Sequence, residues 1–389
     1  MKKKISILGS TGSIGDTVFR LLKEKKDYDF YILSGNKNIK KINYQIKNYK
    51  PKYFIIFDDS TYLKFKRKFY NKKTKILSAD EFLNYKFEKS HIAVAAIPGI
   101  AGLKPTLYII KHSKTILIAN KESVVCGWDL IKNKANKYNT KILPIDSEHF
   151  SIMNLLESTK TKEIEKIYLT ASGGPFLNYS KKMILKAKLS EAIKHPTWKM
   201  GKKISIDSAT LMNKIFEVIE AKKLFSIGFE KIDILIHPQS LVHAIVKYKN
   251  GLYKLLYFET DMGIPIGNVL FGKNFEVKKF KNIKINKKST FENQLNFINV
   301  NEKKFPAIKL KPLLKKYASL PIVLNAANEI FVDQFIKKNI SFYAIINYLF
   351  TLLKDPKIRK YAIKRPSNLK TILTIDKWTR NKAMEILKI

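Results

Sequence analysis

The sequence contains a single cysteine and no long hydrophobic run. Because Cys126 is the only cysteine among 389 residues, an internal disulfide framework and a cysteine-rich zinc site are both excluded. No apolar run approaches the roughly 20 residues that cross a bilayer. The first residues, MKKKISILGSTG, hold too short an apolar stretch for a signal peptide. We therefore expect a cytoplasmic protein with no membrane partner.

Acidic residues are also scarce. The chain has 74 Lys and Arg against 32 Asp and Glu, a formal net charge of +42, which can indicate a nucleic-acid partner. The lysines are nevertheless spread through every segment, with no basic arm, RNP-like motif or zinc-finger pattern, and Lys, Asn, Ile and Tyr are abundant together. We attribute the charge to coding bias and expect no nucleic-acid partner, although the positive field would favour an anionic small-molecule substrate.

The first strand and the loop after it have a dinucleotide-binding pattern. Residues 3–8 are predicted to form a strand, residues 9–15 spell GSTGSIG, and a helix is predicted to run to about Lys25. Backbone N–H groups at such a helix start can meet a pyrophosphate. The spacing is G-x-x-G-x-x-G rather than G-x-G-x-x-G, so a tight turn without a ligand is the alternative.

The next elements extend this pattern. A strand over 30–34 ends without the acid that would hold a ribose 2′-hydroxyl, and Lys37 follows it, which favours NADP over NAD. Strands are predicted near 53–57, 75–78, 91–97 and 115–119, with helices between them. Residues 1–146 are therefore predicted to form a doubly wound, Rossmann-like domain that binds a dinucleotide.

Two polar clusters follow later strands. The cluster Asn120-Lys121-Glu122-Ser123 ends one strand, with a helix start and a local ion pair as the alternative. Asp146 and Glu148 end a strand over 141–145, and their i, i+2 spacing lets both carboxylates face one point. Hard oxygen donors suit Mg2+ or Mn2+ better than zinc. The alternative is that the two acids only begin the next helix.

Residues 147–261 are predicted to form an α+β domain. A strand over 164–171 ends in Ser172-Gly173-Gly174, which suits either a phosphate or a plain turn. A weakly helical connection over 177–201 contains His195 and Trp198, and it could be a substrate-covering lid or a packed surface loop.

The rest of the chain gives weaker signals. A helix is predicted from about 205 to 225, capped by Asp207 or Ser208. Asn213, Lys214 and Glu217 share one polar stripe on it, where Lys214 and Glu217 could be only a solvated surface pair. Antiparallel strands are predicted over 232–236 and 241–260, folded back at Asn250-Gly251. Residues 262–303 are predicted to be an irregular linker, and residues 304–389 a C-terminal helical domain.

Several of these motifs occur together in one known family. The set is GSTGSIG at 9–15, NKES at 120–123, DSEH at 146–149, SGGPF at 172–176, HPTWKMG at 195–201, DSATLMNK at 207–214 and LNAANE at 324–329. With this order and spacing over nearly the whole chain, the sequence resembles the 1-deoxy-D-xylulose 5-phosphate reductoisomerase family. The resemblance implies an NADPH-dependent, metal-dependent oxidoreductase of isoprenoid precursor biosynthesis that acts as a homodimer.

The resemblance also implies a role for individual residues. The metal ligands would be Asp146, Glu148 and Glu217, binding Mg2+ or Mn2+ with Co2+ as a further choice. The substrate phosphate would be held by Ser172, Ser208, Asn213 and Lys214. The hydroxyl end of the substrate would contact Lys121 and Ser147, under a lid that carries His195 and Trp198. The NADPH site would be lined by Thr11, Gly12, Ser13, Ile14, Lys37, Asn38, Asn120, Glu122 and Gly201.

The implied reaction is a rearrangement of 1-deoxy-D-xylulose 5-phosphate followed by reduction to 2-C-methyl-D-erythritol 4-phosphate. One position departs from the family pattern, because Asn36 stands where the family commonly has Gly. The main rival is a generic NADP-dependent dehydrogenase with a cysteine nucleophile. Cys126 lies in an apolar helical pattern, and we expect it to be buried.

Overall fold

The computed structural model describes residues 2–23, 25–68, 73–157, 159–198, 200–280, 283, 294–363 and 365–388. The chain divides into two compact units. The first unit comprises Met1–Ser123, Gly127–Asp146 and Met262–Ile283, and the second comprises Val124–Cys126, Ser147–Asp261 and Lys284–Ile389. No helix in the described part of the chain is long and apolar enough to cross a membrane.

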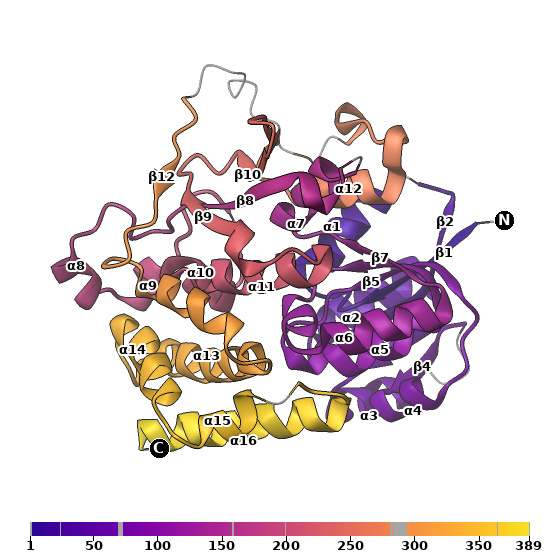
Figure 1. Ribbon diagram of the computed structural model, residues 1–389. Helices are drawn as coiled ribbons and strands as arrows, with labels where there is room; N and C mark the ends of the chain where they lie inside the picture. The colour runs from indigo at the N-terminus through magenta and orange to yellow at the C-terminus, as the bar shows by residue number, and fades with distance from the viewer. Residues whose placement is uncertain are drawn as a thin grey trace. The chain divides into compact units, whose positions relative to one another are not determined.

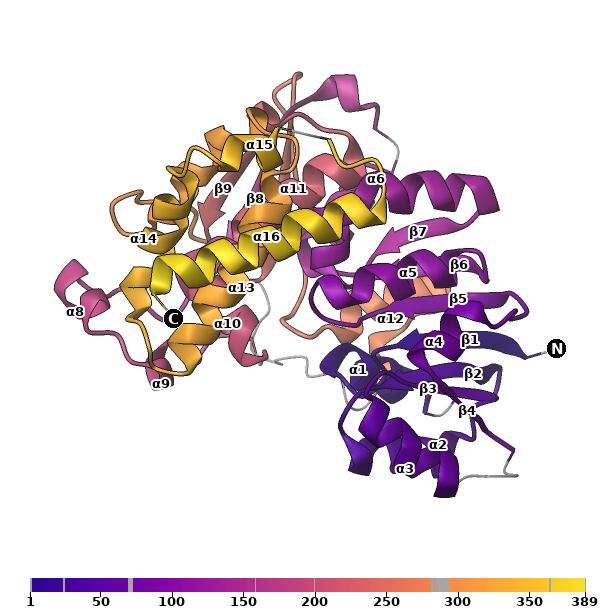
Figure 2. The ribbon, with the colours of Figure 1, turned by 90° about the horizontal axis from the view of Figure 1, so that it is seen from below.

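A seven-stranded sheet is the centre of the first unit. Its strands are β1 Lys3–Leu8, β2 Tyr28–Gly35, β3 Tyr53–Ile56, β4 Lys75–Ser78, β5 Ser90–Ala95, β6 Ser113–Ile118 and β7 Lys141–Pro144. They follow the order β4-β3-β2-β1-β5-β6-β7 (Figure 2), and every neighbouring pair is parallel. The order reverses between β1 and β5, and such a reversal is where ligands bind in open α/β sheets. The prediction of a doubly wound sheet is confirmed.

Helices connect these parallel strands (Figure 1). They are α1 Ser13–Leu22, α2 Ile39–Tyr49, α3 Asp59–Lys68, α4 Ala79–Asn84, α5 Leu103–Ile110 and α6 Lys121–Tyr138. Their caps explain their bounds, since Ser78 and Glu81 form a capping box at α4 and Asn139 ends α6 in the left-handed region. Helix α6 is kinked at Gly127, where a side chain would collide with Leu103.

A five-stranded sheet lies in the second unit. Its strands are β8 Ile164–Ala171, β9 Ile232–Ile236, β10 Val242–Tyr248, β11 Tyr253–Tyr257 and β12 Ile298–Asn299, in the order β11-β10-β8-β9-β12. The β10–β11 hairpin confirms the turn predicted at Asn250-Gly251. The expectation of a purely antiparallel sheet is wrong, because β8 and β9 are parallel. The long connection between these two strands makes the crossover that parallel pairing requires.

The helix predicted over 205–225 is two helices, α10 Lys202–Thr210 and α11 Met212–Phe225. Leu211 separates them with a left-handed backbone, φ 63°. The predicted cap at Asp207 or Ser208 is therefore wrong, because both residues lie inside α10 and Gly201 precedes it. Helix α7, Ser147–Leu155, begins directly after Asp146, and two short helices, α8 Lys181–Leu185 and α9 Leu189–Ala192, occupy the connection predicted as a lid.

The segment predicted to be an irregular linker is partly helical. Helix α12, Gly263–Phe271, lies within residues 262–303 and packs against α1 of the first unit. Tyr28 of that unit donates a hydrogen bond to the Leu270 carbonyl at the end of α12. Residues 281–282 and 284–293 of the predicted linker lie outside the described residues. Apolar burial by Ile264, Ile266 and Leu270 explains the helix despite its glycines and proline.

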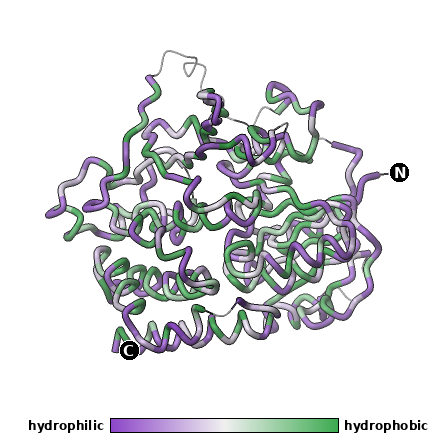
Figure 3. Tube along the Cα trace, viewed as in Figure 1, coloured by the Kyte–Doolittle hydropathy of each residue, from purple (hydrophilic) through white to green (hydrophobic). Residues whose placement is uncertain are grey.

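The C-terminal residues form the predicted helices. They are α13 Leu320–Ile336, α14 Phe342–Leu353, α15 Ile358–Ala362 and α16 Leu369–Leu387, preceded by a 3-10 segment over Pro306–Lys315. Hydrophobic residues recur along α13 and α14 (Figure 3). Helix α13 packs against α10, α14 and α16, so these helices share a core with the rest of the second unit.

Candidate active site

The glycine-rich loop in the first unit brings backbone groups close together at the end of β1. Gly9 has φ 85°, and a Cβ there would lie 2.5 Å from the Ala96 carbonyl oxygen. At Gly15, a Cβ would lie 2.2 Å from the Ser10 carbonyl oxygen. Helix α1 begins after Gly12 without a side-chain cap, so its first N–H groups can face a ligand. Thr11, Gly12, Ser13 and Ile14 form this turn.

The end of β2 carries the residues expected at the 2′-phosphate. Lys37 is 78% exposed at its side chain, and its ammonium lies 3.7 Å from a carboxylate oxygen of Asp58. Hydrogen bonds from Ser60 and Thr61 lower the pKa of Asp58 to about 2. Asn38 caps α2 through the Lys41 N–H at 3.1 Å. Sequence reasoning missed Asp58, because it follows β3 rather than β2.

The polar cluster after β6 has a structural role. The Asn120 side chain accepts a hydrogen bond from the Ser123 N–H at 2.7 Å and donates one to Glu122 at 3.2 Å. Asn120 therefore caps the start of α6. Lys121 extends further, with its ammonium 3.3 Å from Asp146. This ion pair links the end of β6 to the end of β7.

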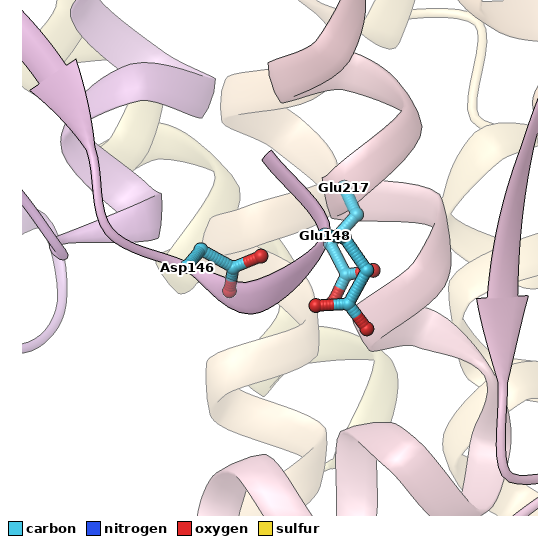
Figure 4. Close-up of side chains that lie close together, drawn as sticks. All are labelled: Asp146, Glu148 and Glu217. Atoms are coloured by element: carbon cyan, nitrogen blue, oxygen red, sulfur yellow. The ribbon is translucent and has the colours of Figure 1, made fainter. Parts of the chain in front are cut away.

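Three carboxylates come together, although Glu217 is distant in sequence from Asp146 and Glu148 (Figure 4). Asp146 follows β7, Glu148 lies in the first turn of α7, and Glu217 lies in α11. One oxygen from each carboxylate lies within 4.8 Å of the other two. Asp146 is joined directly to Ser147 and α7, so the chain itself keeps it close to Glu148. The acids thus begin a helix and also form a cluster that could hold a divalent cation.

Lys214 lies between two of these acids. Its ammonium is 2.6 Å from Glu148 and 2.6 Å from Glu217. Burial lowers the pKa of Lys214, but the two carboxylates outweigh burial and raise it above its ordinary value. Glu217 is 1% exposed, so the alternative of a solvated surface pair is wrong. Helix α11 is buried on nearly all sides, which explains why this polar stripe does not face water.

Two further residues contact the acids from their own helices. The Asn213 side chain donates a hydrogen bond to Glu217, and the Ser147 hydroxyl donates one to Glu148 at 2.7 Å. His149, fully buried, has Nε2 3.0 Å from the Glu217 carbonyl oxygen, which fixes the turn that carries Glu217. The sequence placed His149 in the DSEH motif, but its spacing gave no sign of this contact.

Ser172 and His195 form a second polar group in the second unit. Gly173 and Gly174 have φ 81° and 65°, and this turn brings the Ser172 oxygen within 3.0 Å of the Gly174 N–H. His195 Nδ1 accepts the Trp198 N–H at 2.9 Å, so Nε2 carries the proton and donates to Ser172 at 2.9 Å. Burial, together with the Lys214 charge, lowers the pKa of His195 to about 4.

The segment around His195 is partly packed. The Trp198 ring lies edge-on to the ring of His243, with 5.9 Å between centroids. Gly201 precedes α10, and Ser208 lies in its last turn. Lys199, within the predicted lid over 177–201, lies outside the described residues. Cys126 is 3% exposed, as expected, so it is not placed to act as the nucleophile of the rival dehydrogenase.

Three family models match the chain in succession. Residues 5–127 match 1-deoxy-D-xylulose 5-phosphate reductoisomerase, and residues 142–225 match the C-terminal domain of the same enzyme. Residues 259–382 match a DXP reductoisomerase C-terminal domain. The matches together span most of the chain, including both glycine-rich loops and all three clustered carboxylates.

Proteins that are similar to this chain over nearly its whole length are also named 1-deoxy-D-xylulose 5-phosphate reductoisomerase. The 1-deoxy-D-xylulose 5-phosphate reductoisomerase of Pelagibacter ubique strain HTCC1062 is 44% identical, covering 96% of this chain and 97% of its own. A solved reductoisomerase from Zymomonas mobilis in complex with NADPH is 32% identical, covers both chains fully and has a TM-score of 0.85. A DOX-P reductoisomerase in complex with NADPH, fosmidomycin and magnesium is 33% identical, with 99% and 98% coverage and a TM-score of 0.87. This chain belongs to the 1-deoxy-D-xylulose 5-phosphate reductoisomerase family.

Proposed function

We propose that this chain uses NADPH and a divalent metal ion to convert 1-deoxy-D-xylulose 5-phosphate into 2-C-methyl-D-erythritol 4-phosphate. The observation that carries the proposal is the convergence of Asp146, Glu148 and Glu217 in a chain of this family. The solved relatives with NADPH and with magnesium support the choice of cofactors. The reaction is a rearrangement of the carbon skeleton followed by hydride transfer.

The donor set fits Mg2+ or Mn2+, with Co2+ as a further choice. The three acids offer hard carboxylate oxygens and neither thiolate nor imidazole. Lys214 compensates only part of the negative charge of the three acids, which supports a cation at their oxygens. When bound, the metal would act as a Lewis acid toward the substrate's ketone and hydroxyl oxygens. The chain's own residues position the substrate and control its protons.

The substrate's phosphate would be held by Ser172, Ser208, Asn213 and Lys214. The Ser172 oxygen accepts hydrogen bonds from the Gly174 N–H and from His195, so its own O–H can donate to a phosphate oxygen. Lys214 adds a buried positive charge, which favours an anion where little water competes. Lys121 and Ser147 extend toward Asp146 and Glu148, where they would contact the hydroxyl end of the substrate.

NADPH would bind at the carboxyl ends of the first unit's strands. The pyrophosphate would meet the start of α1 at Thr11, Gly12, Ser13 and Ile14, where the helix has no side-chain cap. Lys37 and Asn38 would contact the 2′-phosphate, with Asp58 orienting Lys37. Asn120, Glu122 and Gly201 would complete the cofactor site.

His195 and Trp198 would cover the substrate. Because its pKa is lowered, His195 is neutral near pH 7 and can donate from Nε2 without adding charge. A covering segment excludes water and keeps the substrate in place through both chemical steps. We propose that His195 and Trp198 move to close over the bound substrate.

We further propose a cytoplasmic homodimer with no nucleic-acid partner. Among the described residues, strand β11 is an edge strand that pairs with β10 alone, and Leu252, Tyr253 and Leu255 are exposed along it and its turn. An exposed apolar edge of this kind favours pairing with a second chain. Sedimentation of the purified protein would test the dimer, and Leu255→Lys should shift it toward the monomer.

One assay tests the proposed function. Wild-type protein mixed with 1-deoxy-D-xylulose 5-phosphate, NADPH and Mn2+ should consume NADPH, followed by the loss of its absorbance. A metal chelator should stop the reaction, and added Mg2+ or Mn2+ should restore it. Omission of the substrate gives the background rate. No NADPH consumption above that background, with metal present and the protein folded, would contradict the proposal.

A further inference from the structure

Two motif residues have no role in the site described above, and they contact each other inside the second unit. Asp207 lies in α10, and Asn328 lies in the LNAANE motif of α13. The Asn328 amide donates to an Asp207 oxygen at 2.7 Å across 121 residues of sequence. We propose that this hydrogen bond is a clasp that positions Ser208 and the bend at Leu211 for binding the substrate's phosphate. The inference rests on the function proposed above.

The clasp is buried, so its geometry is demanding. Asp207 is 1% exposed and Asn328 is 0% exposed. One Asp207 oxygen accepts from Asn328, and the other lies 3.0 Å from the Lys203 ammonium. A buried carboxylate is costly unless its oxygens are hydrogen-bonded or paired. The carboxylate also fixes the orientation of the Asn328 amide. Its nitrogen faces Asp207, because the carboxylate would repel the amide oxygen in that position.

The contact reaches the phosphate site through the backbone. Asp207 directly precedes Ser208, and the Ser208 carbonyl accepts the Leu211 N–H at 3.1 Å. The Leu211 carbonyl in turn accepts the Lys214 N–H at 3.1 Å, in the first turn of α11. A shift of the last turn of α10 therefore moves Ser208 directly and Lys214 through the bend. Asn328 touches neither group, so it is a positioning residue.

A purely structural role makes a different prediction. Helix α13 has a second polar contact at the adjacent Glu329, which pairs with Arg380 of α16, and Arg380 also bonds Asp376 at 2.8 Å. Loss of the Glu329–Arg380 ion pair removes a contact between α13 and α16, and it leaves the contact between α13 and α10 in place. Arg380→Met is thus a matched control, expected to lower the melting temperature while leaving the KM for substrate unchanged.

The experiment compares steady-state kinetics and melting temperatures. Asn328→Leu keeps similar volume but removes the donor to a charged group, and should raise KM for 1-deoxy-D-xylulose 5-phosphate at least about tenfold. Its KM for NADPH should change by less than about threefold, because α1 and its loop are untouched. Asn328→Asp, which places two carboxylates together, should act in the same direction.

A reciprocal exchange provides the decisive variant. Asp207→Asn combined with Asn328→Asp restores an amide–carboxylate pair with its polarity reversed, and should reverse most of the rise in KM caused by Asn328→Asp alone. This comparison holds even if Asn328→Leu does not fold. No recovery in the exchange variant, or an equal rise in KM for Arg380→Met, would overturn the clasp. A wild type that does not consume NADPH with this substrate would instead contradict the proposed function.

Discussion

The glycine-rich loop of the first unit and the acid–lysine cluster of the second unit are suited to charged ligands in different ways. The loop uses backbone N–H groups and close packing, with Gly9 and Gly15 leaving no room for a side chain. The acid–lysine cluster, formed by Glu148, Lys214 and Glu217, uses ionised side chains held 2.6 Å apart. The loop should therefore be sensitive to added volume, and the cluster to changed charge.

The largest expected effect is the loss of a carboxylate from the cluster. Glu217→Gln keeps the shape of the side chain but removes a proposed metal ligand, so kcat should fall by at least about a thousandfold, equivalent to several kcal/mol of transition-state stabilisation. Lys214 keeps Glu148 as a partner, so the variant should remain folded by circular dichroism. Glu230→Gln changes an exposed glutamate paired with Lys315, and should retain activity. Comparable rates for Glu217→Gln and wild type would remove Glu217 from the site.

Added volume in the loop should have the next largest effect. In Gly15→Ala the new Cβ would lie 2.2 Å from the Ser10 carbonyl oxygen, so the free energy of unfolding should fall by about 1–3 kcal/mol. NADPH affinity should fall as well, measured by fluorescence titration. Gly12→Ala is the matched variant, since its Cβ would lie 3.3 Å from the Gly9 oxygen. If Gly12→Ala were the more destabilised of the two, steric crowding would not explain the loop.

Cofactor preference should change by a smaller amount. Wild type should use NADPH in strong preference to NADH. Because Lys37 is largely exposed, Lys37→Ala should reduce this preference by only about fivefold, equivalent to about 1 kcal/mol. Lys40→Ala, which removes another exposed lysine nearby, controls for net charge. Equal efficiency of wild type with both cofactors would contradict the assignment of this pocket.

The smallest expected effect is a pH dependence of stability. His195 has an ordinary pKa of 6.5, lowered to about 4 in the folded protein, so the unfolded chain binds the proton more readily between these values. The contribution of His195 is present above pH 6.5 and is lost as the pH falls toward 4. Urea unfolding of wild type should therefore show a steeper loss over this range than His195→Asn. Parallel curves for the two proteins would mean that His195 is not buried as described.

Local patterns in the sequence were sufficient for the seven-stranded sheet of the first unit. Alternating strands and helices predicted its parallel sheet, and the glycine spacing located the loop before α1. Long-range features were not predictable in the same way. The parallel pairing of β8 and β9 depends on a long connection, and nothing in a leucine at position 211 signals a left-handed break. Helix α12 was missed because Gly263, Pro265 and Gly267 resemble a loop.

The candidate site shows the same limit. Helical periodicity alone favoured a solvated stripe for Lys214 and Glu217, because burial on all sides of α11 depends on tertiary packing. The resemblance to the family brought Glu217 together with Asp146 and Glu148, and the structure agrees with this grouping. Spacing gave no sign of Asp58 beside Lys37 or of His149 beneath Glu217, since both contacts join separate elements.

Direct measurement of metal binding tests the central claim most closely. Mn2+ titrated into the wild-type protein, followed by the decrease of the free-ion signal in electron paramagnetic resonance, should show one site per chain. The double variant Asp146→Asn and Glu217→Gln should lose that site while remaining folded, and Glu230→Gln should keep it. Binding of one Mn2+ with unchanged affinity in the double variant would show that these carboxylates are not the metal site.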